Sequence, residues 1–154
     1  MEFEEFYLGK LGRERSEEYL KEIPSLDSSH RVGILHRKDL LKKYDYGLAI
    51  ARGGLFSGYC FQEMGLPVKA VESQRTEEGA SWNEIESLDE FSGKRILIFD
   101  QDVIHGKTIH RTFKELSRFS PSKLGIFINF PETSNIERIP FSMNLHSYDW
   151  DIEN

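Results

Sequence analysis

The residues whose types and spacing could carry out chemistry are concentrated in one stretch, residues 95–116, RILIFDQDVIHGKTIHRTFKEL. Four apolar residues are followed by Asp100 and Asp102, and Gly106 and Thr108 then stand at the start of a helix-like pattern. Carboxylates at the end of a strand accept hydrogen bonds from hydroxyl groups such as those of a ribose. Amides at a turn and a helix start, helped by a threonine hydroxyl, bind phosphate. One short loop could therefore hold both ends of a pentose phosphate.

Two other interpretations compete with a sugar-phosphate site. Gly106-Lys107-Thr108 matches the end of the P-loop motif GxxxxGK[ST], but this motif requires a glycine at the position where the chain has Gln101. A P-loop is therefore excluded. An ordinary capped junction between a strand with an acidic end and a helix stays open, because such junctions are common.

Composition bounds the class of protein. The chain has 154 residues, 38% of them hydrophobic and 30% charged, which predicts one domain with a real core. A net charge of −6 with scattered basic residues argues against nucleic acid as a partner. The single Cys60 excludes an internal disulfide and fits a reducing compartment. The acidic start, MEFEEF, and the lack of a long apolar run predict a cytoplasmic protein with no membrane partner.

The elements that must position these residues alternate along the chain. Apolar segments predict strands at 46–51, 68–72, 95–100 and 124–130. Helices are expected at 13–22, from Ser28 or Ser29 to Lys43 with Val32, Leu35 and Leu40 in its apolar stripe, at 55–64, and from about Thr108 with Ile109, Phe113 and Leu116 on one face. The polar segment 73–93 is expected to be a long loop or arm.

This order predicts an α/β fold with a mainly parallel, twisted sheet and helices on both faces. We expect one domain over residues 1–154, with a core at about 28–130 and a small tail or hood at 131–154. Ligands of such sheets bind at the carboxyl ends of the strands, near a switch point in strand order. The turns at 52–54 and 105–108 both follow such ends.

Two segments of the chain resemble the type I phosphoribosyltransferases. In ILIFDQDVIHGKT, the apolar run, Asp100, Gly106 and Thr108 match the spacing of that family's phosphoribosyl pyrophosphate motif. Upstream, YDYGLAIARGGLFSGYCFQEMGLPV is similar to the family's strand, pyrophosphate-binding turn and following helix. Lys94 also matches the Gly-Lys that precedes the motif strand. The resemblance covers roughly residues 44–130.

The chain departs from the family motif at several positions. Gln101 stands where the family has a second acid, Asp102 is in a usually apolar position, and His105 replaces a threonine. Ile104 stands where many 6-oxopurine enzymes carry an acidic residue. Two accounts remain open: a one-residue shift lets Asp102 act as the second acid, or the site keeps one carboxylate and binds ribose more weakly.

The resemblance implies transfer of ribose 5-phosphate from phosphoribosyl pyrophosphate to a nucleobase or similar nitrogen acceptor, as in purine or pyrimidine salvage. The alternative is a non-catalytic protein of the same fold that binds a nucleotide or regulates. The implied catalytic residues are Asp100 and Asp102. The implied phosphate-binding residues are Ile104, His105, Gly106, Lys107 and Thr108. The implied pyrophosphate-binding residues are Ala51, Arg52, Gly53 and Gly54, in a turn expected to have unusual backbone geometry such as a cis non-proline peptide.

The resemblance also implies a lid, a base site and a metal ion. Arg75 in the polar segment is the candidate lid cation, with a solvated loop charge as the alternative. Tyr148 and Trp150 are candidates for stacking on a base, and the alternative for Trp150 is a structural anchor. Mg²⁺ would be held largely by the oxygens of the substrate, with Asp100 as a candidate ligand. The implied partner is a small molecule, phosphoribosyl pyrophosphate or a nucleotide, and a homodimer is left open.

Overall fold

The fold is described from a computed structural model in which residues 5–6, 9–10 and 28–153 are placed. The helix expected at 13–22 lies outside these residues. Seven strands form one sheet in the order β3-β2-β1-β4-β5-β6-β7. Four parallel pairings join β2, β1, β4, β5 and β6, and the edge strands β3 and β7 pair antiparallel. The predicted mainly parallel α/β sheet is confirmed.

The predicted strands match the observed ones closely. The first three are β1 (Tyr46–Ala51), β2 (Val68–Glu72) and β4 (Arg95–Asp100), and β5 runs over Lys123–Ile128. Their apolar side chains alternate between the two faces of the sheet: Ala49 and Phe99 belong to one core cluster, and Leu48 and Ile98 to the other. Every strand interior is therefore covered on both sides, as parallel strands require.

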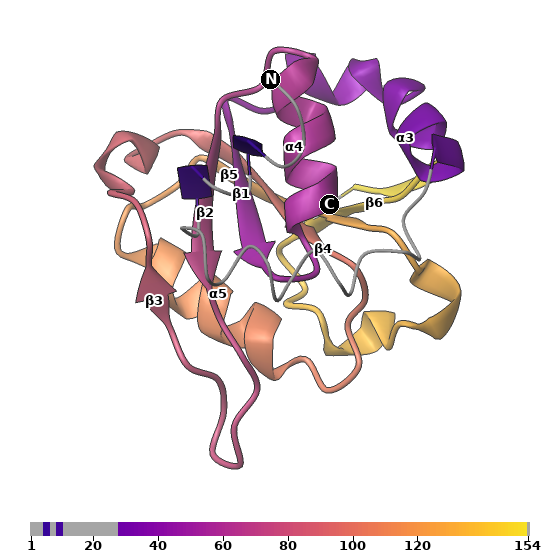
Figure 1. Cartoon of the computed structure of the whole chain (residues 1–154). Helices are drawn as coiled ribbons and strands as arrows, with labels where there is room; N and C mark the ends of the chain where they lie inside the picture. Colours follow the sequence, from indigo (N-terminus) through magenta and orange to yellow (C-terminus); the bar gives the residue numbers. More distant parts are fainter. Residues whose placement is uncertain (1–4, 7–8, 11–27, 154) are drawn as a thin grey trace.

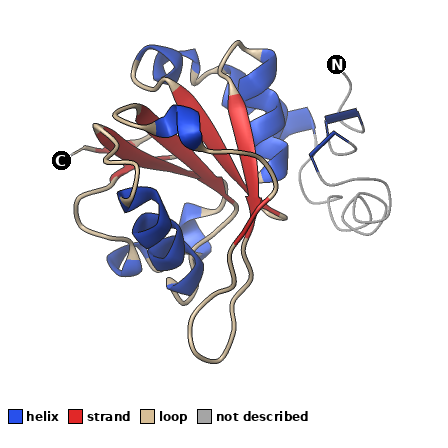
Figure 2. Ribbon diagram, turned by 90° about the vertical axis from the view of Figure 1, so that its left-hand side faces the viewer, coloured by secondary structure: helices blue, strands red, loops and turns tan. Residues whose placement is uncertain are grey.

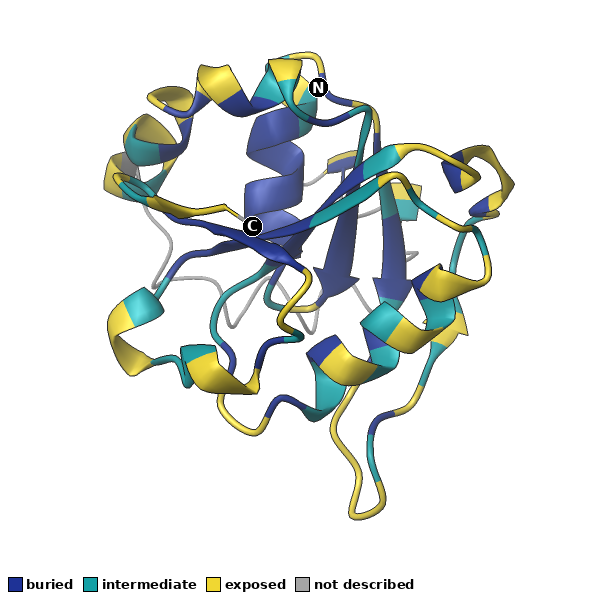
Figure 3. Ribbon diagram, turned by 180° about the vertical axis from the view of Figure 1, so that it is seen from behind, coloured by how far each residue is buried: buried dark blue, intermediate teal, exposed yellow. Residues whose placement is uncertain are grey.

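Helices cover both faces (Figure 2). Helix α4 (Leu55–Glu63) and helix α3 (Ser28–Leu35) pack on the face that carries Ala49, and α5 (Lys107–Ser117) packs on the face that carries Ile98. Helix α4 is buried from Leu55 to Phe61, whereas α5 has one apolar face with Ile109 and Leu116 fully covered. Figure 3 shows the parallel strands and α4 as mostly buried, with the exposed residues on α5, on α3 and in the loops. None of the helices in the placed residues has the length and apolar character needed to cross a bilayer.

The helix expected to run through Lys43 is interrupted. Helix α3 ends at Leu35, and a separate 3₁₀ helix, η1, covers Lys38–Lys42. Leu40 is buried as expected, but Val32 and Leu35 are 53% and 40% exposed, so the predicted apolar stripe is wrong. The cause lies at Arg37, whose buried guanidinium donates to the carbonyl of Ser147 at 2.5 Å and to Asp151 at 2.7 Å. Turning Arg37 inward rotates the chain and breaks the helical register.

The segment after β2, expected to be a long loop or arm, forms a hairpin. Residues 73–84, called the arm below, leave the sheet after β2, turn at residues 76–79 and return through β3 (Asn83–Glu84). Figure 1 shows the arm projecting from the body beside α5. A short 3₁₀ helix, η2 (Asp89–Phe91), then leads to β4.

The tail adds to the edge of the sheet. Two 3₁₀ turns, η3 (Pro131–Thr133) and η4 (Ile136–Arg138), precede β6 (Asn144–His146) and β7 (Asp151–Ile152). Strand β6 pairs parallel with β5, and β7 turns back antiparallel along β6. The tail therefore closes one side of the molecule through backbone pairing, and the hood role expected for it stays a prediction.

Candidate functional site

A pocket of ≈ 600 Å³ lies at the carboxyl ends of β1, β2 and β4. Three segments line it, residues 50–53, 73–75 and 100–109. Strand order reverses direction between β1 and β4, because β2 continues on one side of β1 and β4 lies on the other. Such a switch point leaves a crevice between the loops that follow the two strands. The pocket occupies this crevice.

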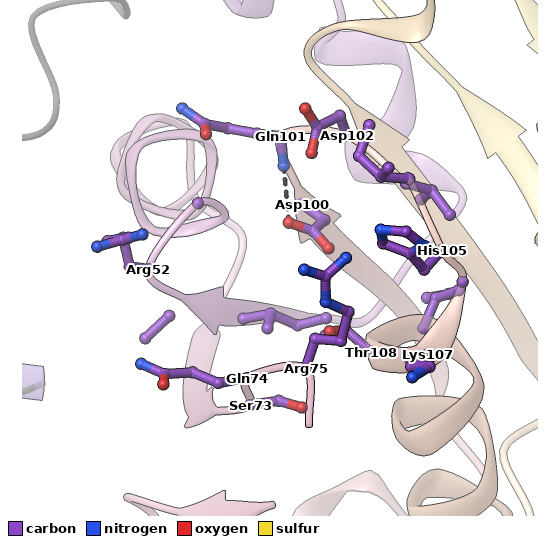
Figure 4. A pocket seen from close by; sticks show the side chains of 17 residues that line it. Arg52, Ser73, Gln74, Arg75, Asp100, Gln101, Asp102, His105, Lys107 and Thr108 are labelled. Atoms are coloured by element: carbon purple, nitrogen blue, oxygen red, sulfur yellow. Dashed lines mark hydrogen bonds between the residues drawn. The ribbon is translucent and has the colours of Figure 1, made fainter. Parts of the chain in front are cut away.

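The first segment is the tight turn between β1 and α4. Its Ala51–Arg52 peptide bond is cis, which confirms the unusual backbone geometry expected here. A Cβ on Gly53 would lie 3.3 Å from Asp100 Oδ1, so the turn passes directly beside the end of β4. Arg52 is exposed at the edge of the pocket (Figure 4). The turn therefore lines the pocket directly beside the end of β4.

The two carboxylates stand on the third segment, residues 100–109, at the end of β4. Asp100 Oδ1 accepts a hydrogen bond from the amide of Gln101 at 2.9 Å. Burial raises the pKa of Asp100 to about 7, the Gln101 amide works against that shift, and the negative charge of Asp102 adds to it. Burial also raises the pKa of Asp102. The two carboxylates are therefore close enough to interact, and no cation of the described residues is among the causes of either shift.

Gln101 takes a different direction. Its side chain extends away from Asp100 in Figure 4 and lies against the turn, with Cβ and Cγ each 3.3 Å from the position of a Cβ on Gly53. Its carbonyl accepts a hydrogen bond from the amide of Phe130 at 2.8 Å, which ties the loop to the end of β5.

The loop from Val103 to Thr108 is built around Gly106. This residue is the N-cap of α5 and has φ +78°, a left-handed conformation that side chains other than that of glycine rarely adopt. The first helical bond runs from the amide of His110 to the carbonyl of Gly106 at 2.9 Å. In the described residues, the amides from His105 to Ile109 and the hydroxyl of Thr108 form no hydrogen bond. The start of α5 is therefore a set of free donors that line the pocket.

Contacts from the tail hold this loop in place. The amide of Val103 donates to Ser134 Oγ at 3.0 Å, and Asn135 Nδ2 donates to the carbonyl of Ile104 at 2.5 Å. The 42% exposed side chain of Ile104 leaves an apolar surface at the pocket rim. The loop thus owes its shape to residues 134–135 as well as to its own sequence.

Basic groups collect at the end of the pocket formed by the start of α5. The pKa of His105 is lowered first by desolvation and then by the charges of Arg75, Arg138 and Lys107. Arg75 reaches the pocket from the arm, and its side chain extends toward the space beside Asp100 in Figure 4. The pocket is therefore polar in a defined sense, with carboxylates at the end of β4 and positive charge at the start of α5. This arrangement suits a ligand with hydroxyl groups at one end and an anionic group at the other.

The structure brings most of the proposed site residues together. The pocket includes Asp100, Asp102, Arg75, Ala51, Arg52, Gly53 and all five residues from Ile104 to Thr108. Gly54 lies behind the turn, where a Cβ would stand 1.9 Å from the carbonyl oxygen of Phe99. Ser73, Gln74 and Val103 also line the pocket and were not assigned from sequence. Ser73 and Gln74 directly follow β2, and their place after a parallel strand is the signal that could have found them.

Tyr148 and Trp150 do not line this pocket. The hydroxyl of Tyr148 is 2.6 Å from His30 Nδ1 and accepts a bond from Asn129 Nδ2 at 2.7 Å. The indole of Trp150 packs against the core on the α5 side of the sheet, and its carbonyl accepts the Ser147 amide at 3.0 Å. Both residues thus have structural contacts of their own, and a role in base binding stays a prediction.

The side chains of the pocket also indicate which metal ion could bind there. Among the described residues, no group of three His, Cys, Asp or Glu side chains is placed to hold a metal. Two carboxylates beside free backbone amides fit Mg²⁺, which typically uses one or two carboxylates, water and substrate phosphates rather than a cage of protein ligands.

No family model matches the chain, and a search of curated proteins finds no match. Solved structures do match. Adenine phosphoribosyltransferase from Saccharomyces cerevisiae, in complex with adenine and an imino-altritol bisphosphate, has a TM-score of 0.58 and 13% identity over 81% of this chain and 80% of that chain.

Two other structures are similar to the same degree. Purine phosphoribosyltransferase from Pyrococcus horikoshii has a TM-score of 0.55 and 17% identity, over 80% of this chain and 92% of that chain. A hypothetical protein from Neisseria gonorrhoeae with bound ppGpp has a TM-score of 0.57 and 21% identity, over 79% of this chain and 80% of that chain. The chain therefore has the fold of the type I phosphoribosyltransferases.

Proposed function

We propose that the protein is a phosphoribosyltransferase that transfers ribose 5-phosphate from phosphoribosyl pyrophosphate to a nitrogen of a nucleobase or a similar acceptor. One observation carries this proposal: the cis turn at Ala51–Arg52, the carboxylates of Asp100 and Asp102 and the free amides at the start of α5 line a single pocket at the switch point. Each group suits one part of phosphoribosyl pyrophosphate: the turn suits the pyrophosphate, the carboxylates suit the ribose hydroxyls, and the amides of α5 suit the 5-phosphate.

The 5-phosphate binds at the start of α5. The amides of His105, Gly106 and Lys107 and the hydroxyl of Thr108 donate to its oxygens, and the charge of Arg75 adds to the attraction. The ribose hydroxyls lie toward Asp100 and Asp102, which accept their hydrogen bonds. The pyrophosphate lies along the turn, where backbone amides and Arg52 bind it.

The reaction passes through a sugar with positive charge on its ring, so negative side chains near the ring stabilise it. Asp100 and Asp102 are the two carboxylates of the pocket and supply this charge when they are ionised. Mg²⁺ supplies a counter-charge to the departing pyrophosphate when it is bound. Asp100 is the candidate protein ligand, with the rest of the shell from the substrate and water.

A second candidate function is non-catalytic binding of a nucleotide in a regulatory role. Gln101 in place of a second acid, and the apolar Ile104 at the rim, favour it because both remove a carboxylate from the pocket. The Neisseria gonorrhoeae neighbour was solved with ppGpp, so a guanosine nucleotide with two diphosphate groups is the probe for this alternative. The first proposal, the phosphoribosyltransferase, also includes a cytoplasmic location and a role in nucleobase salvage.

A calorimetric titration tests the proposal. Phosphoribosyl pyrophosphate is titrated with and without Mg²⁺, and ppGpp and ribose 5-phosphate are titrated in parallel. Free purine and pyrimidine bases are then screened for nucleotide formation. Binding of phosphoribosyl pyrophosphate with nucleotide formation supports the transferase. Binding of phosphoribosyl pyrophosphate or ppGpp without nucleotide formation from any base supports the second candidate. If none of the three compounds binds, both candidates are wrong.

A further inference from the structure

The arm is attached to α5 along one face of the helix. Lys107, Arg111 and Arg118 are four and seven residues apart, which places them within about 40° of one another around a helix of 3.6 residues per turn. All three donate to the arm. The sequence gives no sign of this arrangement, since each cation alone reads as an exposed helical charge.

The contacts follow the arm in order. Lys107 Nζ donates to the carbonyls of Thr76 and Glu77, both at 3.0 Å. Arg111 Nη1 donates to the carbonyl of Ala80 at 3.1 Å, and Arg118 Nη2 bonds to the carboxylate of Glu84. The returning half of the arm therefore runs along the basic face of α5, one contact about every four residues.

The arm is also braced internally. The amide of Thr76 donates to the carbonyl of Gly79 at 2.8 Å, and the amide of Ser81 donates to the carbonyl of Gln74 at 2.8 Å. Ser73 Oγ donates to the carbonyl of Ser81 at 2.7 Å. A two-stranded hairpin is only marginally stable by itself, so these bonds depend on the contacts that hold the arm against α5, and a contact at its turn helps to position its whole length.

Arg75 is the residue of the arm whose position this arrangement determines. It forms an isolated β-bridge with Ala80, the residue that Arg111 holds. Its side chain lines the pocket and acts on His105 through its charge. Lys107, at the first helical position of α5, is both part of the phosphate-side loop and the anchor of the turn of the arm.

We propose that Lys107 and Arg111 are positioning residues that hold the arm on α5 before any ligand is present and thereby place Arg75 over the anion end of the pocket. This attachment of the arm to α5 by Lys107 and Arg111, called the clamp below, exists in the free protein. Its effect on the ligand rests on the proposed function, because it requires an anion at the start of α5. Ordering the arm in advance removes an entropic cost from binding.

Hydrogen exchange of the ligand-free protein tests the clamp. The amides of Thr76 and Ser81, which are bonded within the hairpin, report its opening. We expect Lys107→Met to speed their exchange about tenfold, the effect of losing hydrogen bonds to a charged donor. Lys107→Arg, which keeps donors and charge, should restore most of the protection. Lys114→Met, an exposed lysine on the same helix, is the matched control and should change nothing. Unchanged exchange in Lys107→Met would overturn the proposal.

A double-mutant cycle separates positioning from direct contact. The affinity for ribose 5-phosphate is measured for wild type, Lys107→Met, Arg75→Met and the double variant. If Lys107 acts through Arg75, the double variant loses no more affinity than Arg75→Met alone. Additive losses would mean that Lys107 contacts the anion itself and is not a positioning residue. If wild type fails to bind ribose 5-phosphate, the proposed function and the effect on ligand are wrong, and the exchange experiment still decides the clamp.

Discussion

The backbone of Gly54 lies so close to the carbonyl oxygen of Phe99 that a Cβ on Gly54 would stand 1.9 Å from it. This contact places the start of α4 against the end of β4 and brings the turn at 51–53 next to Asp100. A glycine at position 54 is therefore required by packing. Its neighbour Gly53 has more space, with the nearest atoms at 3.3 Å.

Gly54→Ala should lower the free energy of unfolding by about 3 kcal/mol, because the added methyl group overlaps backbone that cannot move aside. Gly79→Ala, at the turn of the arm with nothing within 4 Å of an added Cβ, should change stability by less than about 0.5 kcal/mol. Chemical denaturation of both variants measures the difference. Equal stabilities would show that the turn relaxes to accept a side chain.

Asp100→Asn should remove a pH dependence of stability. The Asp100 carboxyl has an ordinary pKa of 3.8 in the unfolded chain and a pKa raised to about 7 in the folded protein by burial. Between these values the folded state binds more protons than the unfolded state, so this group's contribution to stability is present below the lower pKa and is lost as pH rises toward 7. Urea denaturation from about pH 4 to pH 8 measures the slope.

In this experiment the difference between wild type and Asp100→Asn reports Asp100 together with its interaction with Asp102, since the other titrating residues are shared. The exposed Asp149→Asn serves as the control and should follow the wild type. Parallel curves for wild type and Asp100→Asn would contradict the raised pKa.

Thr108→Val should weaken binding of phosphoribosyl pyrophosphate about tenfold to a hundredfold, the range expected when a hydrogen bond to a charged group is lost. Valine has nearly the same shape, so the fold should be little affected. Thr112→Val, one turn along α5, is the counterpart: its hydroxyl donates to the carbonyl of Thr108 at 2.8 Å, and it is buried. That variant should lose stability and keep affinity. An affinity loss confined to Thr112→Val would place the anion away from Thr108.

Asp102→Asn and Gln101→Ala decide which residue joins Asp100 on the ribose. The charge of Asp102 acts on Asp100, whereas Gln101 lies against Gly53. We therefore expect Asp102→Asn to weaken the binding of phosphoribosyl pyrophosphate about tenfold and Gln101→Ala to have little effect on it. Titration calorimetry measures both, with inorganic phosphate as a ligand that neither change should affect. The reverse order would support the account in which the site keeps only one carboxylate of its own.

Gly106→Val, a substitution that the sequence motif suggests, does not by itself test the phosphate-binding loop. From the motif, Gly106→Val should reduce ligand affinity with little loss of stability. The structure contradicts the second half of this expectation, because Gly106 has φ +78° and a Cβ there would lie 3.0 Å from Arg138 Cβ and 3.1 Å from its carbonyl oxygen. A left-handed β-branched residue costs at least about 1–2 kcal/mol before any clash, so lower affinity in this variant would not distinguish a lost site from a distorted loop.

The sequence by itself determined the local order of the core. Mainly apolar runs separated by helical patterns identified β1, β2 and β4 with their observed bounds, because strands buried on both faces need apolar residues at nearly every interior position. It also located the turn at Ala51–Arg52 and the loop around Gly106, since glycine punctuates the chain where the backbone must turn sharply. These are signals between residues close in sequence.

Only the tertiary structure decided the contacts between distant residues. Arg37 breaks the expected helix by reaching Ser147 and Asp151, more than a hundred residues away, and nothing in the pattern around Arg37 records those partners. Lys107 could equally have faced solvent or a phosphate, and the path of the arm directs it to Thr76 and Glu77. Tyr148 could have faced the pocket, but bonds to His30 and Asn129 hold it in the body of the protein. Where a polar side chain points depends on which donors and acceptors the fold brings within reach, and that is settled only when the whole chain has packed.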